Sequence, residues 1–136
     1  MSSSSISGEE KLLSGRILVV EDSEINRFIL KKILTKWGLT IDFAENGEIA
    51  LQKVATQKYD TILMDVQMPV MTGTEATVLI REMNHGEFKG LPIIALTATI
   101  LEDDITKIYQ AGMTGYIAKP FEPHQLRMTI EKALGN

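Results

Sequence analysis

In the segment Arg16-Ile-Leu-Val-Val-Glu-Asp22, a run of aliphatic residues ends abruptly in two carboxylates. A continuous β-branched and aliphatic run of this kind is typical of a strand buried on both faces of a sheet. Ser23 follows as a candidate N-cap, and apolar residues then recur at helical spacing until Gly38. The expected inner stripe of this helix consists of Ile25, Ile29 and Ile33, widened by Phe28, Leu30 and Leu34. The stretch therefore predicts a strand followed by a helix.

The same alternation continues along the chain. Further strands are expected at residues 40–44, 60–64, 92–96 and 115–118. Further helices are expected at 47–57, after a loop with Pro69 and Gly73 through about Met83, at 102–111 and at 122–134. Five strands alternating with five helices predict a parallel sheet covered on both faces, with right-handed crossovers. For this length we expect an α/β, flavodoxin-like, doubly wound (βα)5 fold with the strand order 2-1-3-4-5.

The composition excludes several classes of protein. The chain has 136 residues, 44% of them hydrophobic, which is enough for one domain with a sizeable core. It has no cysteine, which removes disulfides, thiolate metal sites and cysteine nucleophiles and is compatible with a reducing compartment. A formal charge of −4 does not favour direct binding of nucleic acid or of an anionic membrane.

Neither end of the chain predicts a membrane or secretion signal. No apolar run approaches the roughly 18 residues of a membrane span, and a signal peptide is absent, so we expect a cytoplasmic protein without membrane insertion. Residues 1–14 begin with a serine-rich segment, and we expect them to be a disordered linker or an expression remnant. Residues 15–136 are the expected folded domain.

Reactive side chains follow four of the five predicted strands. Glu21 and Asp22 follow the first strand, Asp65 follows the third, Thr97 the fourth and Lys119 the fifth. In an open parallel sheet, ligands bind beyond the carboxyl ends of the strands, near the point where the strand order reverses. We therefore expect these side chains to form one site.

The residue types in this predicted site favour phosphoryl chemistry. Three carboxylates repel one another unless a cation lies between them, and hard oxygen ligands favour Mg²⁺. An aspartate beside that ion can act as a nucleophile toward phosphorus, while an ammonium and a hydroxyl can engage the phosphoryl oxygens. Taken singly, Asp22 is more simply a helix cap, Lys119 a solvated lysine and Thr97 a cap or strand residue. Their joint placement favours the functional interpretation.

Four motifs resemble the receiver domain of two-component response regulators. They are Ile-Leu-Val-Val-Glu-Asp at 17–22, Met-Asp-Val-Gln-Met-Pro-Val-Met-Thr-Gly at 64–73, Pro-Ile-Ile-Ala-Leu-Thr-Ala at 92–98 and Gly-Tyr-Ile-Ala-Lys-Pro-Phe at 115–121. The resemblance covers residues 16 to 134 and implies that 15–136 form a receiver domain. In its detailed motifs the chain is most similar to the receivers of hybrid sensor histidine kinases.

The resemblance implies roles for the residues that bind the metal and the phosphoryl group. Asp65 resembles the phospho-acceptor, and Glu21 and Asp22 resemble the acidic pair that holds Mg²⁺ together with it. The main-chain carbonyl of Gln67 is implied as a further metal ligand. Lys119 resembles the lysine that pairs with the phosphoryl group, and its peptide bond to Pro120 is expected to be cis.

The resemblance also implies residues that switch and tune the domain. Thr97 resembles the hydroxyl that moves toward the phosphoryl group, and Tyr116 the aromatic residue whose rotamer reports the state. Ala98 is small, as phosphate access requires, and Gln67 and Thr99 occupy positions that tune the lifetime of the phosphoryl group. Partner contacts are implied for the face formed by the fourth helix, the fifth strand and the fifth helix.

The implied function is phosphorelay signalling. Asp65 would take a phosphoryl group from a sensor histidine kinase or a His-containing phosphotransfer domain, and the chain would be a monomer or a weak dimer. As a catalyst it would be limited to its own phosphorylation and dephosphorylation. One alternative is a receiver that binds partners without phosphorylation. Another is an aspartyl-phosphate phosphatase, which would need its nucleophile after the first strand and an acid two residues later, where this chain has Gln67.

Overall fold

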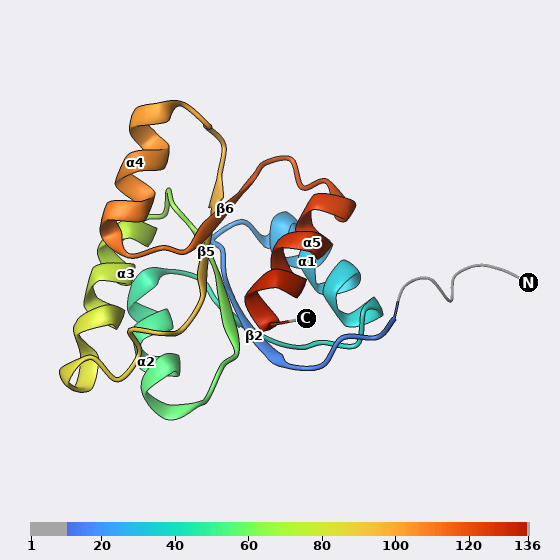
Figure 1. Ribbon diagram of the computed structural model, residues 1–136, viewed down its shortest axis with the longest axis horizontal. Coiled ribbons are helices and arrows are strands. Elements are labelled where there is room, and N and C mark those ends of the chain that lie inside the picture. Colours follow the sequence, from blue (N-terminus) through green and yellow to red (C-terminus); the bar gives the residue numbers. More distant parts are fainter. Residues whose placement is uncertain (1–10, 136) are drawn as a thin grey trace, which may run out of the picture.

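Five parallel strands form one sheet with helices on both faces (Figure 1). The computed structural model describes residues 11–135. The elements are β2 (Arg16–Val20), α1 (Glu24–Lys36), β3 (Thr40–Ala44), α2 (Gly47–Thr56), β4 (Thr61–Asp65), α3 (Gly73–Glu82), η2 (Met83–His85), β5 (Ile93–Thr97), α4 (Glu102–Ala111), β6 (Gly115–Ala118) and α5 (Pro123–Leu134). The order β3-β2-β4-β5-β6 confirms the predicted 2-1-3-4-5, counted along the chain.

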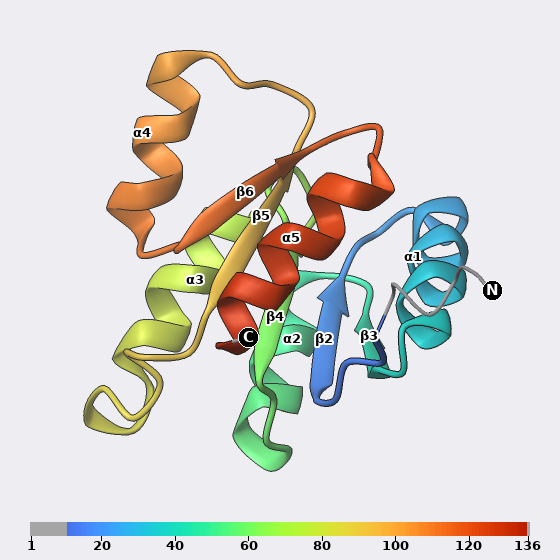
Figure 2. The ribbon, with the colours of Figure 1, turned by 45° about the vertical axis from the view of Figure 1, so that its right-hand side comes forward.

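Two apolar cores lie on opposite faces of the sheet, each under the helices that cover that face; Figure 2 shows these helices on either side of the strands. Helices α2, α3 and α4 cover one face, and α1 and α5 cover the other. Along β2, Leu18 and Val20 belong to the first core, whereas Ile17 and Val19 belong to the second, because successive side chains of a strand point to opposite faces. The sheet is therefore buried on both sides, as the aliphatic run predicts.

The central strands β4 and β5 are buried at every position, whereas the edge strands β3 and β6 are partly exposed. Both central strands begin and end one residue later than predicted from the sequence. Asp65 and Thr97 are consequently the last residues of their strands, not the first residues of the following loops. Their backbones are held by the sheet, which fixes the start of each side chain.

Helix α1 buries only part of the apolar stripe that the sequence predicts. Leu30 and Leu34 are fully buried, but Ile25 is 72% exposed and Phe28 is 61% exposed. The predicted stripe of Ile25, Ile29 and Ile33 is therefore wrong for its first two members. Both sides of this helix carry apolar residues, so periodicity alone does not decide which side faces the sheet.

The N-terminal boundary of the domain also lies earlier than expected. Leu13 is only 8% exposed and belongs to the core between α1 and α5. Its backbone N–H donates to the carbonyl of Trp37 at 2.7 Å, directly after α1. Residues 11–14 thus pack against the domain, which corrects that part of the predicted linker; residues 1–10 lie outside the described part of the chain.

Candidate functional site

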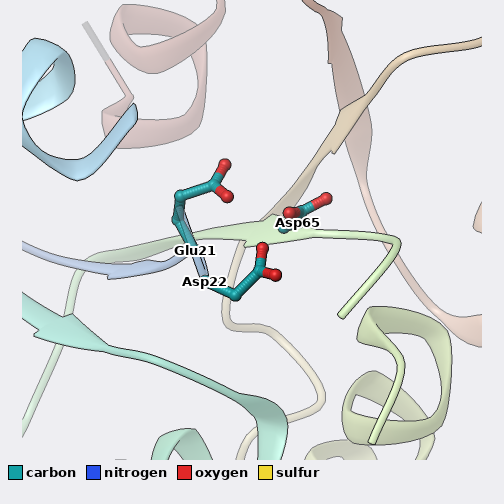
Figure 3. A group of neighbouring side chains, drawn as sticks. All are labelled: Glu21, Asp22 and Asp65. Atoms are coloured by element: carbon teal, nitrogen blue, oxygen red, sulfur yellow. The ribbon is translucent and has the colours of Figure 1, made fainter. Parts of the chain in front are cut away.

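Three carboxylates meet at the carboxyl end of the sheet (Figure 3). Glu21 and Asp22 follow β2, and Asp65 ends the neighbouring strand β4. One carboxylate oxygen from each residue lies within 4.8 Å of the other two. Glu21 is fully buried and Asp65 is 3% exposed, while Asp22 is exposed at the rim. The predicted acidic cluster is present, and its donor set of hard oxygens fits a divalent cation such as Mg²⁺.

Lys119 joins the two buried carboxylates. Its Nζ lies 3.1 Å from Glu21 Oε1 and 3.2 Å from Asp65 Oδ2. The lysine follows β6, and its peptide bond to Pro120 is cis, as expected. The ammonium offsets the repulsion between two carboxylates that the sheet brings together.

The start of α1 holds Glu21 in place. The Ser23 backbone N–H donates to Glu21 Oε2 at 3.1 Å, and the Asn26 side-chain amide lies 3.5 Å from Oε1. Arg27 donates to the Glu21 main-chain carbonyl at 2.7 Å. Asn26 and Arg27 were not among the predicted site residues. Asn26 is the third residue of α1, a position from which side chains often reach back to the cap, and this signal could have indicated it.

The loop after β4 holds Asp65. The Gln67 backbone N–H donates to Asp65 Oδ1 at 3.1 Å, so this main chain contacts the carboxylate. Gly73 opens α3 against the end of β4, where a Cβ atom would overlap the main-chain carbonyl of Asp65. A glycine is required at this close approach. Thr72, just before it, begins α3 with a capping box to Glu75.

Electrostatics in the site are dominated by burial. Burial raises the pKa of Asp65 from 3.8 to about 7; Glu21 adds to the increase, and Lys119 opposes it. For Lys119, burial acts to lower the pKa, but the carboxylates of Asp65 and Glu21 outweigh it and the pKa is raised. The lysine therefore remains a cation, whereas Asp65 sits close to its titration point at neutral pH.

The Thr97 hydroxyl lies at the same end of the sheet but is engaged elsewhere. Thr97 is buried at the end of β5, which pairs with β4. Its Oγ1 donates to the Thr99 carbonyl at 2.9 Å and accepts from the Thr99 N–H at 3.2 Å. Within residues 11–135 it makes no hydrogen bond to Asp65 or Lys119.

Two further predicted residues lie on β6 and on the loop after β5. Ala98 is exposed beside Thr97, and Tyr116 lies half-buried on the edge strand β6. The Tyr116 ring stands edge-on to that of Tyr109 on α4, with centroids 6.5 Å apart. Both tyrosines line a cavity of about 490 Å³ between α4, β6 and α5, together with Met128.

The family of the chain follows from comparison with known proteins. The family model of the response regulator receiver domain matches residues 17–131. The chain belongs to this family of two-component phosphorelay proteins. The receiver domain of a sensor histidine kinase from Pseudomonas aeruginosa PAO1, solved with a magnesium ion coordinated in its active-site cleft, superimposes with a TM-score of 0.82 at 36% identity, covering 91% of this chain and 100% of that one.

Curated relatives include both hybrid kinases and short regulators. Hybrid signal transduction histidine kinase I of Dictyostelium discoideum is 40% identical over 92% of this chain, but the chain spans only 7% of that protein. A two-component response regulator of Oryza sativa subsp. japonica is also 40% identical, over 86% of this chain and 92% of its own length. These similarities favour phosphotransfer signalling over the two alternatives. Among the described helices, none has the length and apolarity that crossing a bilayer requires.

Proposed function

We propose that Asp65 is the phospho-acceptor and that Lys119 and Thr97 assist the transfer. The observation that carries this assignment is the bridge of Lys119 to two buried carboxylates, 3.1 Å from Glu21 and 3.2 Å from Asp65. A buried ion pair is expensive to maintain, and it leaves a cation next to the atom that would gain a phosphoryl group.

In the proposed step, one Asp65 carboxylate oxygen attacks the phosphorus of a phosphohistidine. A phosphorus–oxygen bond forms while the phosphorus–nitrogen bond breaks, and the leaving imidazole nitrogen keeps the electron pair and takes up a proton. Lys119 stays within reach of the new phosphoryl oxygens, and Thr97 donates to one of them once it leaves Thr99. Ala98 presents only a methyl group at the entrance, which leaves room for the donor.

Glu21, Asp22 and Asp65, with the main-chain carbonyl of Gln67, are the proposed ligands of Mg²⁺. The ion would supply charge neutralisation for the phosphoryl oxygens in transfer. The clustering of three carboxylate oxygens within 4.8 Å supports this assignment. Gln67 and Thr99 flank the acceptor and the switch hydroxyl and are the proposed tuning positions.

The proposed partners are a sensor histidine kinase or a His-containing phosphotransfer domain, in the cytoplasm, with this chain as a monomer or weak dimer. A donor protein must cover the rim of the site to bring its histidine to Asp65. On the α1 side of this rim two apolar side chains, Ile25 and Phe28, are exposed. The cavity lined by Tyr116 and Tyr109 is the proposed surface that changes after phosphorylation.

The test is Mg²⁺-dependent labelling of the whole chain with phosphoramidate, a small donor that carries phosphorus on nitrogen. Intact-mass spectrometry should detect one added phosphoryl group in the wild type and none in Asp65→Asn. Lys119→Ala should be labelled at least about tenfold more slowly, because the transition state loses a cation.

The matched control is Asp103→Asn, which changes an exposed aspartate in the first turn of α4 and should be labelled like the wild type. Labelling of Asp65→Asn at the wild-type level would disprove the acceptor assignment. A wild type that takes no label in the presence of Mg²⁺ would favour a receiver that binds partners without phosphorylation.

A further inference from the structure

We propose that Thr99 and Asp104 hold the Thr97 hydroxyl in a resting position, which makes Asp104 a positioning residue for phosphoryl transfer. This inference rests on the proposed function of Asp65 and Thr97. It adds a carboxylate on α4 that belongs to none of the assigned groups of the site.

The first link joins Thr97 to the loop after β5. The Thr97 hydroxyl donates its proton to the Thr99 carbonyl at 2.9 Å and accepts from the Thr99 N–H at 3.2 Å. A hydroxyl has one proton to donate, so it cannot donate to Thr99 and to a phosphoryl oxygen at the same time. Engaging the phosphoryl group therefore requires that the bond to Thr99 break, in a site where Thr97 is only 3% exposed and few waters can replace it.

The second link joins Thr99 to α4. The Thr99 hydroxyl donates to Asp104 Oδ2 at 3.2 Å and accepts from the Leu101 N–H at 3.3 Å. Asp104 is half-buried in the first turn of the helix, and a hydrogen bond to a charged acceptor is stronger than one between neutral groups. The loop residue that holds Thr97 is thus itself anchored by Asp104.

The structure of α4 distinguishes Asp104 from the other acids of its first turn. Leu101 occupies the N-cap of α4 and provides no side-chain hydrogen bond, so Thr99 and Asp104 close the start of the helix instead. Glu102 and Asp103 are exposed, and their side chains form no hydrogen bond or ion pair within residues 11–135. Removing either of those carboxylates changes the helix charge without touching Thr99.

The consequence is a resting state that opposes transfer. Thr97 can leave Thr99 only if the loop rearranges, and the bond to Asp104 resists that rearrangement. Weakening the bond should raise the fraction of molecules in which Thr97 is free to turn toward Asp65. Because the bond to Asp104 is long at 3.2 Å and only partly buried, we expect it to contribute no more than an ordinary hydrogen bond, about 0.5–1.5 kcal/mol, and the effect to be about threefold to tenfold.

The experiment compares two pairs of variants in the full chain. Thr99→Val and Asp104→Ala remove the donor and the acceptor, whereas Thr99→Ser and Asp104→Asn keep a hydroxyl and an acceptor oxygen. Two quantities are measured with Mg²⁺ present: the initial rate of labelling by phosphoramidate and the affinity for beryllofluoride, a phosphoryl analogue. Amide NMR shifts of Thr97 and Thr99 without any donor report the resting position directly.

Thr99→Val and Asp104→Ala should each increase the labelling rate and the beryllofluoride affinity about threefold to tenfold. Their Thr97 amide shift should move toward the value of the analogue-bound wild type. Thr99→Ser should keep wild-type values, and Asp104→Asn, whose neutral acceptor makes a weaker bond, should lie between the wild type and Asp104→Ala. Asp103→Ala, the matched charge control, should change none of them.

Unchanged or lower rates in Asp104→Ala, or the same gain in Asp103→Ala, would overturn the proposal while wild-type labelling upheld the function of Asp65. A wild type without labelling would instead refute the proposed function. If Thr99→Val does not fold, the two Asp104 variants decide the question alone, because Asp104 is partly exposed and outside the core.

Discussion

At the scale of single residues, the site keeps a carboxylate where ionisation is costly. Asp65 is buried at the end of a central strand beside Glu21, and its pKa is raised to about 7 by burial first and by Glu21 second. Lys119 offsets part of this cost. The ionised Asp65 carboxylate therefore lowers the stability of the folded protein, at the position where we propose that phosphoryl transfer occurs.

This arrangement predicts that, without metal, Asp65 lowers the stability of the folded chain as the pH rises. Its folded-state pKa lies above the reference value of 3.8, so between about pH 4 and pH 7 the folded state binds the proton that the unfolded chain has lost. Any contribution of Asp65 to the free energy of unfolding is complete below pH 4 and is lost as the pH rises through 7. Asp65→Asn should thus be more stable than the wild type at pH 8, by about 2–4 kcal/mol, and by less than half of that at pH 5.

Urea unfolding in EDTA at the two pH values measures this difference. Asp103→Asn supplies the control, because its exposed carboxylate should give the same small difference at both pH values. Equal differences at pH 5 and pH 8 for Asp65→Asn would contradict the prediction. The raised pKa of Lys119 does not interfere, because the stabilisation that it contributes is constant below its reference value of 10.5 and is lost only as the pH rises above that value.

At the scale of elements, α1 shows how a helix can be predicted correctly while its orientation is not. Its N-cap, Ser23, accepts from the Asn26 N–H at 3.2 Å, as the sequence indicates. Of its predicted stripe, however, Leu30 and Leu34 are fully buried whereas Ile25 and Phe28 are exposed, because the apolar residues extend around more than one side of the helix. Only packing against β3 and within the core shared with β2 and α5 decides which side is buried.

The corrected orientation predicts unequal effects of two truncations in α1. Leu34→Ala should lower the free energy of unfolding by about 2–5 kcal/mol, because Leu34 is fully buried and its removal leaves a cavity. Ile25→Ala removes a similar number of atoms from a side chain that is 72% exposed and should cost less than about 0.5 kcal/mol. Urea unfolding of both variants measures the contrast. Comparable losses of stability would show that Ile25 is buried like Leu34 and would contradict the corrected orientation.

At the scale of the whole molecule, the N-terminal segment closes the core between α1 and α5. Leu13 packs with Trp37 and Leu126, and the carbonyl of Lys11 accepts a hydrogen bond from Arg127 on α5. The Arg127 guanidinium also lies 5.4 Å from the centre of the Trp37 ring. A few residues before β2 thus connect the two helices on one face of the sheet.

This packing predicts a contrast between neighbouring leucines. Leu13→Ala should lower the midpoint of thermal unfolding, with a loss of about 2 kcal/mol, whereas Leu12→Ala should have little effect because Leu12 is 76% exposed. Calorimetry of the two variants provides the measurement. If Leu13→Ala is as stable as Leu12→Ala, residues 11–14 do not contribute to the core, and the linker expected from the sequence is correct there.

The candidate site divides in the same way into what could be predicted and what could not. Glu21, Asp65 and Thr97 could be placed together because a parallel sheet aligns the carboxyl ends of its strands, and this rule needs only their order. The hydrogen-bond partners of each side chain could not be predicted from the sequence. The bond from Asn26 to Glu21 and the link from Thr99 to Asp104 depend on loop conformations that no periodicity describes.

The sequence by itself determined the strands, the helices, their order and the residue types of the site, because these follow from hydrophobic periodicity, caps and the positions of polar residues. Tertiary structure alone decided which face of α1 is buried, where the domain begins, that Lys119 bridges Glu21 and Asp65, and that the Thr97 hydroxyl rests on Thr99. The physical reason is that periodicity is a local property of the chain. Burial, pKa and hydrogen-bond partners depend instead on groups brought together from distant positions.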